Sequence, residues 1–120
     1  NMTERRRALS VRQPHAEAIM SGEKSIEFRS RRTHIRGTIY IYAAAGRYAR
    51  GEEAKMMKKY KIADVECDDL SRGVVIGTVE LHDCVEGKDS FRWHLRDPVR
   101  AKRKRKPSGK PQPVWFYPFT

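Results

Sequence analysis

Residues 37 to 45 read Gly-Thr-Ile-Tyr-Ile-Tyr-Ala-Ala-Ala, a run that contains almost no polar side chain. Isoleucine and tyrosine favour extended strands. A strand with one face in water would alternate apolar and polar residues, whereas this run is apolar on both parities. The segment therefore predicts a strand that is buried on both faces, as in a small closed barrel.

A second strand is expected over residues 73–85, where side chains alternate between two faces. One face carries Val75, Val79 and Leu81. The other face starts apolar and becomes polar at Glu80, which predicts that Glu80 lies where the barrel interior meets a cleft. Shorter strands are expected at residues 7–12, 24–29, 91–96 and 114–117.

Two segments carry helix signals instead. Ala16, Ile19 and Met20 repeat at i, i+3 and i+4, which predicts a helix over residues 14–21 that lies on the core. Residues 51–60 have glutamates near the start and lysines near the end, an arrangement that complements the helix dipole. Strands are in the majority, so the expected fold class is α+β: a small β-barrel of about five to six strands with two to three helices packed around it.

The chain of 120 residues is expected to form one domain, 1–120, because two separate cores of that size would each be too small to be stable. No apolar run approaches the roughly 18 residues that cross a bilayer, so no membrane partner is expected. Cys67 and Cys84 are interpreted as reduced thiols of a cytoplasmic protein. The histidines show no metal-ligand spacing, so no metal or cofactor is expected. The chain is expected to be a monomer.

The formal net charge of +11 is unevenly distributed along the chain. Residues 100–110 hold seven cations and no acid, Arg5 to Arg7 add three, and residues 62–89 carry eight acids against two cations. A one-sided basic field is typical of proteins that bind polyanions. Residues 98–113 are expected to be a basic loop that contacts phosphates, although such runs are also common as solvated loops. Its candidate phosphate-binding cations are Arg100, Lys102, Arg103, Lys104, Arg105 and Lys106.

One short helix-turn-strand unit places further cations and hydrogen-bonding groups at its two ends. Arg12 and Gln13 precede the helix, whereas Lys24, Glu27 and Arg29 follow it. One interpretation is purely structural: Lys24, Glu27 and Arg29 form an ion-pair cluster that braces two strands. The alternative is that the unit holds these groups toward a ligand.

The order of these motifs resembles that of the ASCH family, named for the activating-signal-cointegrator homology domain, whose fold is similar to the PUA RNA-binding barrel. The resemblance covers about residues 8–117. It rests on Ser10-Val-Arg-Gln-Pro14, Gly22-Glu-Lys24, Glu27-Phe-Arg29, Arg36-Gly37, Ile41-Tyr-Ala43, Gly77-Thr-Val-Glu80, Asp83-Cys84, Trp93 and Trp115. It implies a PUA-like barrel with a cleft formed by the Gln-Pro segment, the Gly-x-Lys turn and facing strands. Members are regarded as related to RNA or other nucleic acids, and a few are enzymes.

Given that resemblance, the side chains of the unit have specific expected roles. Arg12, Lys24 and Arg29 would bind phosphate. Gln13 would read a base edge, and Glu27 or Glu80 would accept a hydrogen bond from an exocyclic amine. The remaining nucleic-acid-binding candidates are His15, which can stack on a base, Tyr48, Arg31 and Arg32. Phe28, Tyr40 and Tyr42 are expected in the core.

The expected function is nucleic-acid binding, with RNA favoured over DNA. One alternative is an enzyme that acts on RNA or a modified nucleoside. The family's acetylcytidine amidohydrolases use a lysine, a threonine and a glutamate, which here fall on Lys24, Glu27 and Glu80. A carboxylate at residue 27 cannot replace a hydroxyl nucleophile, so that activity is not expected. A ribonuclease would use Glu27 or Glu80 with Lys24 and Arg29. A further alternative is a protein-interaction domain that uses the acidic segment 62–89.

Overall fold

The computed structural model describes residues 5–119. Along the chain the elements are β1 (Ala8–Arg12), α1 (His15–Ser21), β2 (Ile26–Arg29), β3 (Gly37–Ala44), α2 (Arg50–Lys59), a short 3-10 turn (Cys67–Asp69), β4 (Val74–Glu86), β5 (Phe91–Arg105) and β6 (Trp115–Phe116). The six strands form one sheet in the order β2-β5-β4-β3-β1-β6. β1 and β3 are parallel, and the other neighbours are antiparallel.

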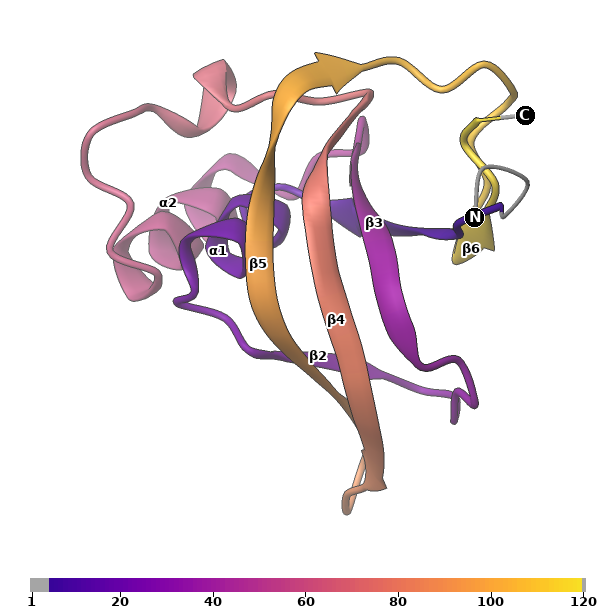
Figure 1. Ribbon diagram of the computed structural model, residues 1–120. Coiled ribbons are helices and arrows are strands. Elements are labelled where there is room, and N and C mark those ends of the chain that lie inside the picture. Colours follow the sequence, from indigo (N-terminus) through magenta and orange to yellow (C-terminus); the bar gives the residue numbers. More distant parts are fainter. Residues whose placement is uncertain (1–4, 120) are drawn as a thin grey trace.

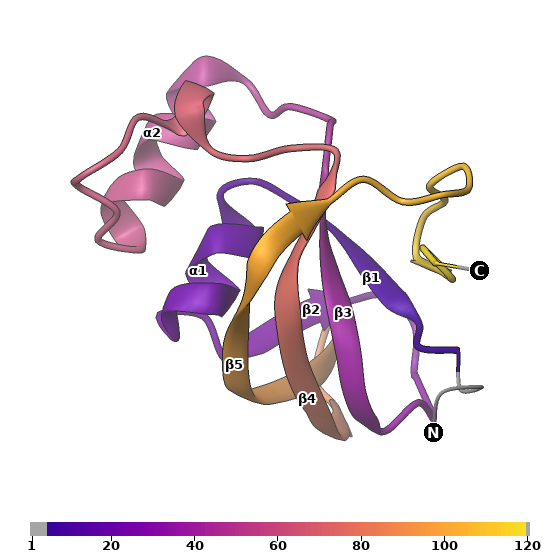
Figure 2. The same ribbon diagram turned by 45° about the horizontal axis from the view of Figure 1, so that its top comes forward.

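The sheet curls into a half-barrel, and both helices lie at the end of it that is remote from β6 (Figures 1 and 2). The expected α+β fold with a small barrel-like sheet and two helices is therefore confirmed. The barrel differs from a closed one, because in the described residues the edge strands β2 and β6 are not paired with each other.

The prediction that the strand at 37–45 is buried on both faces holds for its middle, around Ile41 and Tyr42, whereas Thr38 and Ala45 are exposed. Ile41 and Ala43 of β3 belong to the main core cluster, whereas Tyr42 packs on the other face with Val75 and Phe116. Such double burial is possible because the sheet wraps over one face of β3 and the C-terminal segment covers the other. β3 is consequently the central strand of the fold.

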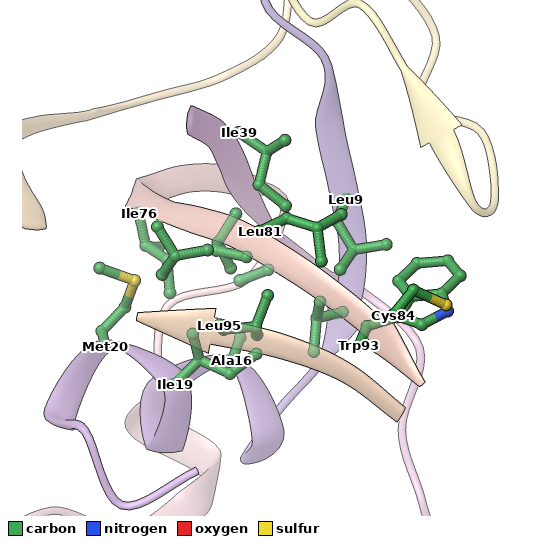
Figure 3. Close-up of a cluster of buried hydrophobic side chains, with 14 residues drawn as sticks. Leu9, Ala16, Ile19, Met20, Ile39, Ile76, Leu81, Cys84, Trp93 and Leu95 are labelled. Carbon is green, nitrogen blue, oxygen red and sulfur yellow. The ribbon is translucent and has the colours of Figure 1, made fainter. Parts of the chain in front are cut away.

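Helix α1 fills the inside of the curled sheet. Its Ala16, Ile19 and Met20 point toward the strands that carry Leu81 and Leu95 (Figure 3). Gly22 ends the helix in the left-handed conformation, with φ of 87°, a geometry that glycine adopts without steric cost. The chain then turns directly into β2, so the helix and β2 form the compact unit that the sequence indicates.

The structure corrects two of the expectations. The basic segment does not begin as a loop at residue 98, because β5 continues to Arg105 and pairs with β4 through Gly77 and Val75. Phe28 does not lie in the core either: its side chain is 56% exposed. Tyr42 is buried and Tyr40 half-buried, as expected. In the described part of the chain no helix is long and apolar enough to cross a membrane.

Gly77 lies where α1 and β5 press against β4, and this contact yields a stability prediction. A Cβ at residue 77 would collide with the end of Met20 and would lie 2.5 Å from the backbone oxygen of Val99, which has little freedom to move. We expect Gly77→Ala to lower the free energy of unfolding by about 1–3 kcal/mol in urea denaturation. Gly51→Ala, in α2 with open space around it, should instead raise it by about 0.5–1 kcal/mol. Equal effects of the two substitutions would contradict this packing.

Candidate functional site

A pocket of about 760 Å³ opens where β1 and β3 end side by side. The parallel register pairs Arg12 with Ala44, so both strands deliver their last residues to the same place. The remaining walls come from β2 with Lys24 before it, His15 of α1, the loop that follows β3 and the segment 110–113. The described residues that line it include Ser10, Arg12, His15, Lys24, Glu27, Phe28, Arg29, Tyr42, Gly46, Tyr48, Lys110 and Gln112.

The charges in this pocket are mostly positive. Arg12, Lys24, Arg29 and Lys110 line it, and the single carboxylate among the described lining residues is Glu27. Glu27 is only 7% exposed. It accepts a hydrogen bond from Arg29 at 2.8 Å and forms an ion pair with Lys24 at 3.5 Å. The cluster therefore braces β2 and faces the pocket at the same time, so the two interpretations of these residues are compatible.

Burial changes the protonation behaviour of the groups around this carboxylate. Desolvation lowers the pKa of Lys24, and the nearby Glu27 partly offsets that effect by favouring the charged amine. Arg29 also donates to the backbone oxygen of Ser10 at 3.0 Å, which ties β2 to β1. Lys24 and Arg29 are thus both held at the pocket by the carboxylate on β2, and Arg29 is held by β1 as well.

Two aromatic side chains, His15 and Tyr48, line the pocket together with the cations. The Arg12 guanidinium lies 5.2 Å from the centre of the Tyr48 ring, and His15 meets Tyr48 edge to face at 5.5 Å. His15 Nδ1 lies 2.7 Å from the hydroxyl oxygen of Tyr60. Burial, and then the charge of Lys24, lowers the pKa of His15. A neutral imidazole and a tyrosine ring therefore form one wall of the pocket.

Tyr48 is held in place by a buried carboxylate that the sequence did not reveal. Glu53, on α2, is 4% exposed and accepts a hydrogen bond from the backbone N–H of Tyr48 at 3.1 Å. Its two oxygens also accept bonds from Arg47 at 2.9 and 2.6 Å, and Arg47 extends to Asp68 at 2.6 Å. The sequence signal for Glu53 was only its favourable charge near a helix start.

Phe28 is a second feature of the site that sequence reasoning missed. Its exposed ring lines the pocket, and Lys24 Nζ lies 5.3 Å from the ring centre. The alternation in β2 placed Phe28 with the apolar Ile26, which suggested burial. The structure instead leaves a large apolar ring at the rim of a cationic pocket, where it is available to a ligand.

Two of the candidate residues lie elsewhere, and their expected roles are corrected. Gln13 is only 1% exposed: its side-chain oxygen accepts from the Glu17 N–H at 2.9 Å, and its amide nitrogen donates to the Ser71 oxygen at 2.9 Å. It braces the start of α1 and does not face the pocket. Glu80 is not among the described lining residues. It accepts two bonds from Arg96, which lower its pKa.

The other cationic candidates are distributed over the surface. Arg31 is exposed, and Arg32 pairs with Glu86 at 3.2 Å. On β5, Arg100 donates to both oxygens of Glu17, and Lys104 donates to Ser71 at 2.8 Å. The remaining cations of the segment are exposed at Lys102, Arg103, Arg105 and Lys106, of which Arg105 covers the Phe119 ring. None of these residues is among the described residues that line the pocket. Within residues 5–119 no cluster of metal-ligating side chains occurs.

The buried cluster at β2 predicts a large effect of removing its carboxylate. Glu27→Ala would leave the poorly exposed Lys24 and Arg29 without their partner. Breaking a buried ion pair in this way costs about 3–5 kcal/mol. The exposed Glu86 offers a control, because Glu86→Ala removes a surface pair that contributes at most about 1 kcal/mol. Chemical denaturation of both variants checks this, and a similar small loss in each would contradict the cluster's structural role.

The Arg47–Glu53 contact predicts a pH dependence of stability. Hydrogen bonds from Arg47 lower the pKa of Glu53 to about 2, from an ordinary value of 4.5. The charged carboxylate therefore stabilises the fold above pH 4.5, and this contribution is lost as the pH falls toward about 2. We expect the difference in unfolding free energy between the wild type and Glu53→Gln to shrink over that interval. Glu52→Gln, at an exposed neighbouring position on the same helix, serves as the matched control.

Comparison with known proteins agrees with the fold. The ASCH domain family model matches residues 9–112. Activating signal cointegrator 1 is 36% identical over 84 residues in Homo sapiens and 34% in Mus musculus; each match covers 67% of this chain and 14% of the relative. The matched region is thus a small part of the length of those relatives.

Two solved structures of an ASCH protein from Zymomonas mobilis are also similar. The protein itself superposes with a TM-score of 0.59 at 19% identity, covering 94% of this chain and 87% of the other. A point mutant of the same protein gives a TM-score of 0.57 at 18% identity, with coverages of 95% and 90%. At such low identity these structures bear on the fold alone. The family match over most of the chain establishes that this protein belongs to the ASCH domain family.

Proposed function

We propose that this ASCH domain binds single-stranded nucleic acid and takes one nucleotide into the pocket beside Arg12 and Lys24. The observation that carries the proposal is the composition of that pocket: four cations, one carboxylate that is ion-paired with two of them, and aromatic rings. Cations that track phosphates and aromatic side chains that stack on bases are the two elements of single-strand recognition. The volume of about 760 Å³ also falls in the range of small-molecule sites.

Arg12 is the cation best suited to a phosphate. It is exposed, and it lies against Gly46, where any Cβ would be 2.8 Å from its Nε. The Tyr48 ring beneath it orients the guanidinium without using its N–H donors. An arginine in this state can bind a phosphate through two hydrogen bonds. Lys24 adds a second charge deeper in the pocket.

Phe28 is suited to a base. Phe28 is exposed at the rim beside Lys24, which keeps a phosphate-binding group within one nucleotide of the ring. A base that stacks on such a ring must be unpaired. Folded RNA presents unpaired bases in loops, bulges and single strands, whereas most DNA is duplex, so RNA is the ligand that we propose.

We propose that the protein binds RNA and does not cleave it. Glu80, the second carboxylate an enzyme would use, is bonded to Arg96 outside the pocket. Glu27 is bonded to Arg29 and Lys24, and its carboxylate cannot act as a hydroxyl nucleophile. RNA incubated with the protein should therefore stay intact on a denaturing gel.

Removal of Arg12 tests the pocket directly. A hydrogen bond to a charged group contributes about 1.5–3 kcal/mol, so Arg12→Ala should weaken single-stranded RNA binding by about 10- to 100-fold in fluorescence anisotropy. Phe28→Ala should cost a similar factor through lost stacking, at about 1–3 kcal/mol per base. The matched control is Arg96→Ala, which removes the same charge outside the pocket and should change affinity little. Failure of the wild type to bind single-stranded RNA, hairpin RNA and duplex DNA at low salt would refute the proposal.

A further inference from the structure

Two further hollows continue from the pocket along one side of the molecule. The middle hollow, of about 390 Å³, shares Lys110 and Gln112 with the pocket. The arginine hollow, of about 620 Å³, shares Arg5 and Arg7 with the middle hollow. Because each neighbouring pair has lining residues in common, the three depressions lie next to one another, and we refer to them together as the track. It runs from the end of β1 back past β6 to the residues that precede β1.

The fold explains why these hollows are neighbours. β6 pairs with the first half of β1, and Arg5 and Arg7 lie over the ring of Tyr117, so the C-terminal segment and the arginines that precede β1 are neighbours. β1 itself joins the ends of the track, with Arg7 just before it and Arg12 as its last residue. At about 3.3 Å per residue, its five residues span roughly 17 Å. That length suits several linked nucleotides and exceeds what one nucleotide needs.

The chemistry of the track is cationic and aromatic. Among the described residues, neither the middle nor the arginine hollow is lined by an acidic side chain. The Arg5 and Arg7 guanidiniums lie 4.0 and 5.4 Å from the centre of the Tyr117 ring, and Arg6 lies 5.3 Å from that of Tyr40. Cations interleaved with rings in a groove are what a single strand requires along its length.

We propose that a single-stranded RNA held by one nucleotide in the pocket continues along this track, with its flanking phosphates on Arg5 and Arg7. This inference rests on the proposed function and adds the path of the strand. This path leads the flanking nucleotides away from the basic strand β5. Arg100 and Lys104 of β5 already bond to Glu17 and Ser71. Lys102 and Arg103 line none of the three hollows.

Two double variants with equal charge changes separate the track from β5. Arg5→Ala/Arg7→Ala and Lys102→Ala/Arg103→Ala each remove two positive charges from exposed positions. Their affinities are measured for uridine monophosphate and for oligouridylates of up to about 12 nucleotides, at several salt concentrations. Wild-type affinity should rise with length until the track is filled.

The expected result is specific to the track variant. Arg5→Ala/Arg7→Ala should bind the mononucleotide as the wild type does, yet lose most of the gain with length. For this variant, the slope of the logarithm of the binding constant against the logarithm of the salt concentration should decrease in magnitude by roughly 0.7 per lost phosphate contact. The β5 variant should keep the gain. If the track variant keeps the increase of affinity with length, or the β5 variant loses it, the proposed path is wrong. The proposal that the pocket binds one nucleotide is not affected by that result. If the wild type binds neither the mononucleotide nor any oligonucleotide, the proposed function itself fails.

Discussion

The burial of β3 on both faces is the constraint on which the rest of the molecule depends. One face of this strand meets the core that α1 completes, and the other meets the C-terminal segment through Tyr42 and Phe116. Because β1 pairs with β3 in parallel, both strands end at the same edge of the sheet. That edge carries Arg12 from β1 and leads directly into the loop with Tyr48. The pocket is thus a consequence of the strand order.

Two buried carboxylates then set the shape and charge of the pocket. Glu27 of β2 holds Arg29 of the same strand and Lys24, which precedes it, whereas Glu53 holds the loop that presents Tyr48. Each is bonded to an arginine, which offsets the cost of its burial. The negative charges are therefore used inside the structure, and the surface that faces a ligand remains cationic and aromatic. The buried carboxylates are paired with arginines inside the structure, and the pocket still presents a positive surface.

Sequence reasoning predicted the elements whose signals are local. The period of Ala16, Ile19 and Met20 predicted α1, and the double parity of residues 37–45 predicted the central strand. The strand predicted at 91–96 was shorter than β5, because Arg100 to Arg105 show no apolar alternation. These residues are extended because they pair with β4. Residue type correctly identified Arg12 and Lys24 as pocket residues. It misplaced Gln13 and Glu80, because the direction of a side chain depends on backbone register and on partners such as Ser71 and Arg96 that are distant in sequence.

Backbone amide NMR of the labelled protein titrated with a short oligouridylate tests the central claim most directly. The account predicts that the shift changes cluster at residues 10–15, 24–29, 42–48 and 110–112, which line the pocket, and extend to residues 5–7 and 115–117 along the track. Changes confined to residues 100–106 of the basic strand, with the pocket residues unmoved, would contradict it.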